Sequence, residues 1–127
     1  MISRLADRPR NATAAIDPAP LLGHWINYDD ASQNISRLTI AQRGDAVVLR
    51  IIGVPDIDWG ETAVNPFALT VGGGEAVAFK AVYDFGFLRI HIVAYLNKRL
   101  LVVDAYSTFH DDSGRSSYFA RDHFYLS

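Results

Sequence analysis

Cysteine is absent from this chain of 127 residues, and only one methionine is present. Without cysteine the protein has no disulfide bonds, no thiolate metal sites and no cysteine nucleophile. The four histidines lie far apart and show none of the His-x-His or His-x-x-x-His spacings that zinc and iron sites use. We therefore expect no metal and no organic cofactor, and we expect stability to come from the burial of apolar side chains.

An excess of charge of one sign is also lacking. The chain has 12 Lys and Arg residues, which are scattered, and 14 Asp and Glu residues, so that its net charge is -2. Nucleic acids and anionic membranes bind clustered cations, which this distribution does not offer. No run approaches the ~18 consecutive apolar residues of a membrane-spanning helix, and residues 1–20 contain no apolar segment of signal-peptide length. We therefore expect a cytoplasmic protein with neither nucleic acid nor membrane as a partner.

Hydrophobic residues are plentiful, at 50% of the chain, and 12% of the residues are aromatic. Residues 1–20 contain three prolines and several charges, which predicts a flexible arm. From Leu22 onward, short apolar runs alternate with turn residues, and no long segment has the helical period of 3.6 residues. This pattern predicts a single all-β domain over residues 21–127.

The apolar runs predict about eight strands. Their expected ranges are Leu22–Tyr28, Ile35–Gln42, Ala46–Gly53, a weak strand Thr62–Val71, Ala76–Asp84, Phe87–Leu96, Leu100–Phe109 and a last strand that ends at Leu126. Pro66 interrupts the weak strand, and residues 54–60 are expected to form a loop. Sequential antiparallel strands joined by tight turns protect their edges best by closing into an up-and-down barrel, whose interior can hold one small ligand. An open sandwich is the alternative architecture.

Period-2 alternation assigns side chains of the later strands to two faces. One face of the Phe87–Leu96 strand is expected in the core because it is aliphatic: Leu88, Ile90, Ile92, Ala94 and Leu96. The opposite face carries Phe87, Val93 and Tyr95, an outer apolar surface that suits a homodimer or another partner. Side chains of the last hairpin are also expected to face inward: Leu101, Val103, Ala105, Ser107, Phe109, Tyr118, Ala120, Asp122 and Phe124.

Residues 109–118 are expected to form the turn of that last hairpin. In this turn Asp111 and Asp112 can accept hydrogen bonds from backbone amides, and Gly114 can adopt a positive φ. Arg115 supplies a guanidinium group close to both carboxylates. The simplest interpretation is a well-specified turn.

Several of these segments resemble known families. Gly23-His24-Trp25 is similar to the Gly-x-Trp that opens the barrel of lipocalins and avidins, which belong to the calycin group. A family of small bacterial proteins shares a Trp-x-Asn-x-Asp strand, an Asp-Trp-Gly loop and a Phe-x-Asp-x-Ser-Gly-Arg-x-x-Tyr hairpin. The matching segments here are Trp25–Asp29, Asp58–Gly60 and Phe109–Tyr118. A fourth segment, Ile35–Leu38, also resembles the sequences of that family. Members of that family often carry an export signal and two cysteines before Asp-Trp-Gly. Here the corresponding loop, Val54–Ile57, has no cysteine, and we expect no export signal. The resemblance implies a calycin-like barrel and no particular activity.

Two residues of the first strand are candidates for contact with a ligand. Trp25 either contacts the ligand or plugs the closed end of the barrel against a basic side chain, for which Arg37, Arg115 and Arg121 are candidates. Asn27 lies on the same face as Trp25, and its amide either hydrogen-bonds a ligand or braces the next strand.

The remaining candidates lie later in the chain. If Asp122 is buried without a cation nearby, its raised pKa would suit a general acid or base, whereas a partner such as Arg37 or Arg115 would make it a structural ion pair. Tyr118 and Tyr83 either donate hydrogen bonds into the cavity or fill it. Trp59 either covers the mouth of the barrel or docks beneath its own loop. Ser107 and Phe109 complete the expected lining.

These residues support three hypotheses about function. The first is binding of a small apolar or aromatic molecule by Trp25, Asn27, Trp59, Tyr83, Ser107 and Phe109. The second is a cofactor-independent cyclase or isomerase, in which Asp122 or Tyr118 moves a proton on a hydrophobic biosynthetic intermediate in the same cavity. The third is an interaction module that uses the outer face.

Overall fold

The computed structural model describes residues 15–127, which form ten strands and one short 3-10 helix. In chain order the elements are β1 Ile16–Asp17, η2 Ala19–Leu21, β2 Gly23–Asn27, β3 Ile35–Arg43, β4 Ala46–Gly53, β5 Ile57–Ala63, β6 Asn65–Ala68, β7 Gly74–Asp84, β8 Leu88–Asn97, β9 Leu100–Phe109 and β10 Tyr118–Leu126. The all-β prediction is confirmed. Among residues 15–127, no helix has the length and apolarity that crossing a membrane requires.

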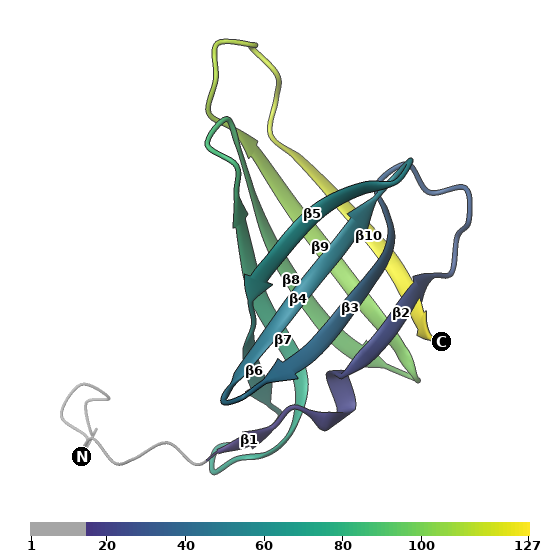
Figure 1. Ribbon diagram of the computed structural model, residues 1–127, viewed down its shortest axis with the longest axis vertical. Coiled ribbons are helices and arrows are strands. Elements are labelled where there is room, and N and C mark those ends of the chain that lie inside the picture. Colours follow the sequence, from purple (N-terminus) through teal and green to yellow (C-terminus); the bar gives the residue numbers. More distant parts are fainter. Residues whose placement is uncertain (1–14) are drawn as a thin grey trace, which may run out of the picture.

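The strands form one strongly curled sheet (Figure 1). Its order is β1-β7-β8-β9-β10-β2-β3-β4-β5, and β6 pairs with the first part of β7. All pairs are antiparallel except β1 with β7, which is parallel. The sheet curls into a half-barrel without closing, because β5 at one end has no backbone ladder to β7 within the described residues. The predicted closed, antiparallel, eight-stranded barrel is therefore wrong in strand number, in closure and in strand direction.

Burial along the strands follows the expected alternation. On β8 the aliphatic residues Ile90, Ile92 and Ala94 are buried and His91 is exposed, so the predicted core face is confirmed. The inner faces of the other strands fill the interior with mainly aliphatic side chains, among them Leu38, Ile40, Leu49, Ile51, Phe79, Leu101, Val103 and Phe124. The middle of the half-barrel is consequently a packed core.

Two segments differ from the sequence predictions. Residues 57–60 were expected in a loop because Pro55 and Gly60 punctuate them, yet β5 starts at Ile57 and pairs with β4 through an irregular register between Arg50 and Ile52. The expected strand 62–71 is split between β5 and β6, which pair with different strands.

The start of the chain also differs from the predicted arm. Within the range expected to be a flexible arm, Ile16 and Asp17 pair with β7 as β1, and η2 follows. Residues 1–14 of that arm lie outside the described residues.

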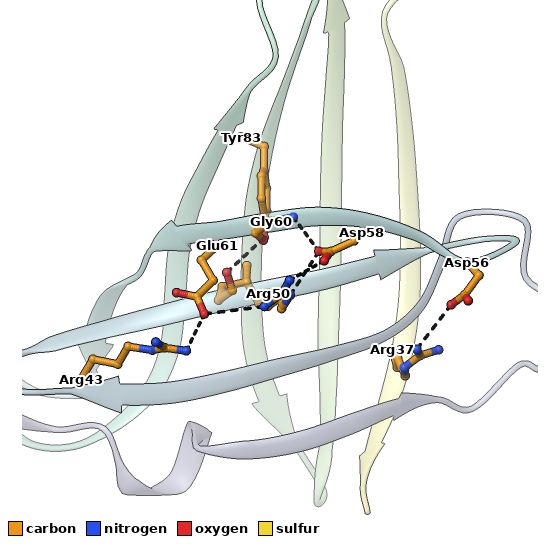
Figure 2. Close-up of polar contacts among 9 residues, drawn as sticks. Arg37, Arg43, Arg50, Asp56, Asp58, Gly60, Glu61 and Tyr83 are labelled. Atoms are coloured by element: carbon orange, nitrogen blue, oxygen red, sulfur yellow. Dashed lines mark hydrogen bonds and ion pairs between the residues drawn. The ribbon is translucent and has the colours of Figure 1, made fainter.

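Side chains connect the two ends of the sheet where the backbone ladder is missing. The Thr62 hydroxyl on β5 donates to the Val82 carbonyl on β7 at 2.7 Å. The Tyr83 hydroxyl lies 2.8 Å from the Gly60 carbonyl and 3.1 Å from the Leu49 carbonyl, and Figure 2 shows its ring reaching across to β5. We call this junction between β5 and β7 the seam.

The Tyr83 hydroxyl should therefore contribute to stability. Replacing Tyr83 by Phe removes the hydroxyl from a side chain that is only 3% exposed, so we expect a loss of about 1–2 kcal/mol in the free energy of unfolding. Urea unfolding followed by circular dichroism measures this loss. The control is Tyr106→Phe on the exposed face of β9, where we expect a change within about 0.5 kcal/mol. Equal effects of the two substitutions would contradict the proposed role of the seam hydroxyl.

Candidate functional site

An apolar cavity of about 440 Å³ lies at one end of the half-barrel. It is lined by Ile57, Asp58, Trp59, Phe85, Phe87, Leu88, Ile90 and Tyr118. These residues come from the start of β5, the turn between β7 and β8, the start of β8 and the start of β10. The walls therefore combine both ends of the sheet, and we call this hollow the mouth cavity. Its volume lies in the range of about 300–1,000 Å³ that is usual for small-molecule sites.

Two Asx turns of the same design, one within β5 and one at the connection between β7 and β8, carry aromatic rings to the mouth cavity. They are residues 58–60, Asp-Trp-Gly, and residues 84–86, Asp-Phe-Gly. The Gly60 amide donates to Asp58 Oδ1 at 2.8 Å, and the Gly86 amide donates to Asp84 Oδ1 at 2.9 Å. Both glycines have positive φ, 81° and 86°, which other residues rarely adopt. The middle residue of each turn is thereby held in a defined position.

An arginine from the neighbouring strand holds each of these aspartates. Arg50 on β4 donates to both carboxylate oxygens of Asp58, and Arg89 on β8 donates to Asp84 Oδ2 at 2.9 Å. Figure 2 shows Arg50 between Asp58 and Glu61 on the outer surface of β4 and β5. The hydrogen bond from Arg50, supported by the Gly60 amide, lowers the pKa of Asp58. The hydrogen bond from the Gly86 amide, supported by Arg89, lowers the pKa of Asp84. Both carboxylates are therefore ionised at neutral pH.

The rings that these turns present pack against each other. Trp59 makes edge contacts with Tyr83 and Phe85, with ring centroids 5.5 Å and 6.4 Å away and interplanar angles of 84°. Tyr83 and Phe85 stack at 5.7 Å. Burial raises the pKa of the Tyr83 phenol, so this hydroxyl stays protonated and acts as a donor to the seam carbonyls.

A second aromatic pair joins Tyr118 of the cavity lining to Phe109, a predicted site residue that does not line the cavity. Tyr118, which lines the cavity and is 48% exposed, packs against Phe109 with ring centroids 6.1 Å apart. The guanidinium group of Arg115 lies 4.0 Å from the centroid of the Phe109 ring. Ser107, another predicted site residue, is buried on β9 in register with Tyr118 and does not line the cavity.

The turn at residues 109–118 has the hydrogen bonds predicted for Asp111 and the positive φ predicted for Gly114. Asp111 accepts hydrogen bonds from the Ser113 amide at 3.1 Å and from Arg115 at 2.8 Å, and Gly114 has a φ of 71°. The hydroxyl of Ser113 is the main cause of the lowered pKa of Asp111. Asp111 thus fills the role predicted for it.

The structure places Trp25 and Asn27 outside the mouth cavity. Trp25 is 2% exposed in the core, and its Nε1 donates to the Leu21 carbonyl at 2.9 Å. The Asn27 amide donates to the Ile35 carbonyl at 2.7 Å, and its oxygen accepts from the Asp29 amide at 2.9 Å. Asn27 therefore braces the next strand, as the structural alternative predicted.

The three arginines proposed as partners of Trp25 pair with aspartates elsewhere. Arg37 pairs with Asp56, Arg115 with Asp111 and Arg121 with Asp104. Two of these arginines were also the proposed partners of Asp122, so the predicted ion pair is wrong.

Asp122 is partly exposed and lies away from the mouth cavity. Its carboxylate accepts a hydrogen bond from the Ser32 hydroxyl at 3.0 Å. It lines a different, polar hollow of about 240 Å³, together with Asn27, Tyr28, Asp29, Leu100, Arg121 and His123. Asp122 and Tyr118, the two residues that the sequence suggested as alternative proton carriers, therefore line different cavities.

Sequence reasoning missed several residues of the cavity, chiefly Phe85 and Phe87. Phe87 was expected on the outer face with Val93 and Tyr95, but the Gly86 turn interrupts the alternation and β8 begins only at Leu88. The three residues proposed for a dimer surface consequently do not share one face. The signal that could have identified Phe85 is the repetition of Asp-aromatic-Gly at residues 58–60 and 84–86.

Comparisons with protein families, with curated proteins and with solved structures found no match to this chain. Within residues 15–127, no group of three or more His, Asp or Glu side chains is arranged to hold a metal ion. The location of the protein and its partners stay predictions from the sequence.

The two Asp-aromatic-Gly turns should loosen in acid. Their lowered carboxylate pKa values contribute stability that is present above the ordinary aspartate value of 3.8 and is lost as the pH falls through the lowered values. We expect the amide resonances of Gly60 and Gly86 to shift upfield together below about pH 4, as each loses its charged acceptor. Proton–nitrogen correlation spectra recorded from pH 7 to pH 2 measure these shifts.

Asp58→Asn is the matched control for this titration. It should abolish the acid shift of Gly60 and leave that of Gly86 unchanged. If Gly60 still titrates in this variant, the carboxylate of Asp58 is not the group responsible.

Proposed function

We propose that the protein binds a small, neutral, planar apolar or aromatic molecule in the mouth cavity. The observation that carries this proposal is the lining of the cavity, which combines aromatic and aliphatic side chains with few polar groups. Ligand sites commonly have such a lining. The aromatic residues are Trp59, Phe85, Phe87 and Tyr118, and the aliphatic residues are Ile57, Leu88 and Ile90.

Charge in the cavity wall argues for a neutral ligand. Asp58 is the only charged residue in the lining, and its two carboxylate oxygens already accept hydrogen bonds from Arg50 and Gly60. A charged ligand would lose its hydration without gaining a free partner of opposite charge. The half-exposed Tyr118 hydroxyl offers one point at which a ligand hydroxyl, ketone or ring nitrogen can form a hydrogen bond.

Binding is favoured over the cyclase or isomerase alternative. Proton transfer in the cavity needs a group that can change its protonation state near neutral pH. Asp122 lies in another hollow, and Asp58 is held ionised by Arg50, which leaves Tyr118 as the one proposed catalytic residue in the lining. No second group there is placed to assist it.

The calycin-like resemblance belongs to this proposal as well. Lipocalins and avidins, to which the Gly23–Trp25 segment is similar, hold their ligands within a curled antiparallel sheet. The present sheet is also curled and mainly antiparallel, but it is open and its middle is packed, so we place the ligand at the end of the half-barrel.

Binding can be tested with the neutral fluorescent probe N-phenyl-1-naphthylamine. We expect its emission to rise and move to shorter wavelength with the wild-type protein, and a probe concentration of 100 Kd should stabilise the fold by about 2.7 kcal/mol. Trp59→Ala should weaken binding about tenfold or more, because it removes an aromatic wall. Fluorescence titration and thermal unfolding measure these effects.

The control for Trp59→Ala is Tyr106→Ala, which removes an aromatic ring from the outer face of the sheet. It should leave probe affinity unchanged. Equal loss in both variants, or no binding by the wild-type protein, would contradict the proposed site.

A further inference from the structure

The indole of Trp59 lies directly against the backbone of Gly53, the last residue of β4. A Cβ atom at position 53 would lie 2.6 Å from Trp59 Nε1 and 3.2 Å from Cε2, both closer than van der Waals contact allows. Gly53 is buried, pairs with Ile57 of β5, and does not line the mouth cavity. Trp59 does line it, so the same side chain lies both against Gly53 and at the wall of the cavity.

The backbone conformation does not explain a glycine at this position. Eight glycines of the described residues have positive φ, and Gly53 is not one of them. An alanine is therefore compatible with the backbone of Gly53, and the reason for glycine is the space that the indole occupies.

The other neighbours of Trp59 limit where its ring can move. Tyr83 and Phe85 contact the indole edge to face, and Tyr83 is itself fixed by its hydrogen bonds to carbonyls of β4 and β5. A side chain at position 53 must push the ring by roughly 1 Å to reach normal separation. Because Trp59 lines the mouth cavity, this displacement changes the dimensions of the cavity.

We propose that Gly53 determines the size of ligand that the mouth cavity accepts, by letting the Nε1 edge of the Trp59 indole lie close against β4. This inference rests on the proposed function, because it concerns the same cavity. Gly53 acts through Trp59 and does not touch the ligand, so it is a positioning residue that sets specificity. The ligand class that needs this glycine is aromatic molecules larger than a fused bicyclic ring.

The test compares two neutral fluorescent probes of different size, 1-naphthylamine and N-phenyl-1-naphthylamine, on four proteins. Gly53→Ala should weaken binding of the larger probe at least tenfold and binding of the smaller probe less than threefold. Trp59→Phe, which keeps an aromatic wall of smaller size, should change the ratio of the two affinities in favour of the larger probe. In the double variant Gly53→Ala with Trp59→Phe, the affinity for the larger probe should return to within threefold of wild type.

The outcomes distinguish this inference from the proposed function. If the wild-type protein binds neither probe, the proposed function is wrong and the inference is wrong with it. If the wild-type protein binds both, then equal losses in Gly53→Ala, no loss, or failure of the double variant to recover overturns the role of Gly53 alone. If Gly53→Ala does not fold, the change of affinity ratio in Trp59→Phe decides, and an unchanged ratio overturns the inference.

Discussion

The organisation of this protein depends on how the two ends of its curled sheet meet. β5 and β7 come together without a backbone ladder, and the hydroxyls of Thr62 and Tyr83 connect them by donating to carbonyls. Unpaired strand edges attract other strands, and proteins protect them with charges or by covering them. Here charged side chains of β3, β4 and β5 cover the outer surface beside the seam, and Figure 2 shows Arg43 and Arg50 both pairing with Glu61. Because the sheet stays open at this point, both of its ends can contribute to one cavity.

The same hydrogen-bond pattern recurs at residues 58–60 and 84–86, and it explains how Trp59 and Phe85 are held in place beside the open edge of the sheet. In each Asp-aromatic-Gly turn the aspartate accepts the glycine amide and is held by an arginine from the adjacent strand. Surface ion pairs contribute little to stability alone, usually below about 1 kcal/mol. Their value here is positional, since they fix the turn that carries Trp59 or Phe85. The cavity thus combines a defined shape with a location where strand pairing has ended.

Sequence patterns predicted most strands and few of the functional contacts. Alternation identified β4 and the core face of β8, because one face of each strand is buried and the period of two is a local property. It missed β5, whose pairing with β4 depends on Arg50 and Asp58 across the sheet, and it predicted closure, which depends on residues far apart in the chain. The surroundings of Asp122 could not be predicted for the same reason, since its hydrogen-bond partner, Ser32, is 90 positions away in the sequence. Trp59 was placed at the mouth as one alternative because an aromatic residue in an expected loop is a local signal.

The way the core satisfies its polar groups determines how a ligand can be recognised. A buried amide or indole N–H needs a partner, and the backbone supplies one to both Asn27 and Trp25. Within residues 15–127, no fully buried side-chain nitrogen or oxygen atom lacks a hydrogen-bond partner. The interior consequently has no spare donor or acceptor with which to select a ligand. For the ligand that we propose, discrimination at the mouth cavity must then come mainly from the distances between aromatic walls, and we infer that the close approach of Trp59 to Gly53 sets one of those distances.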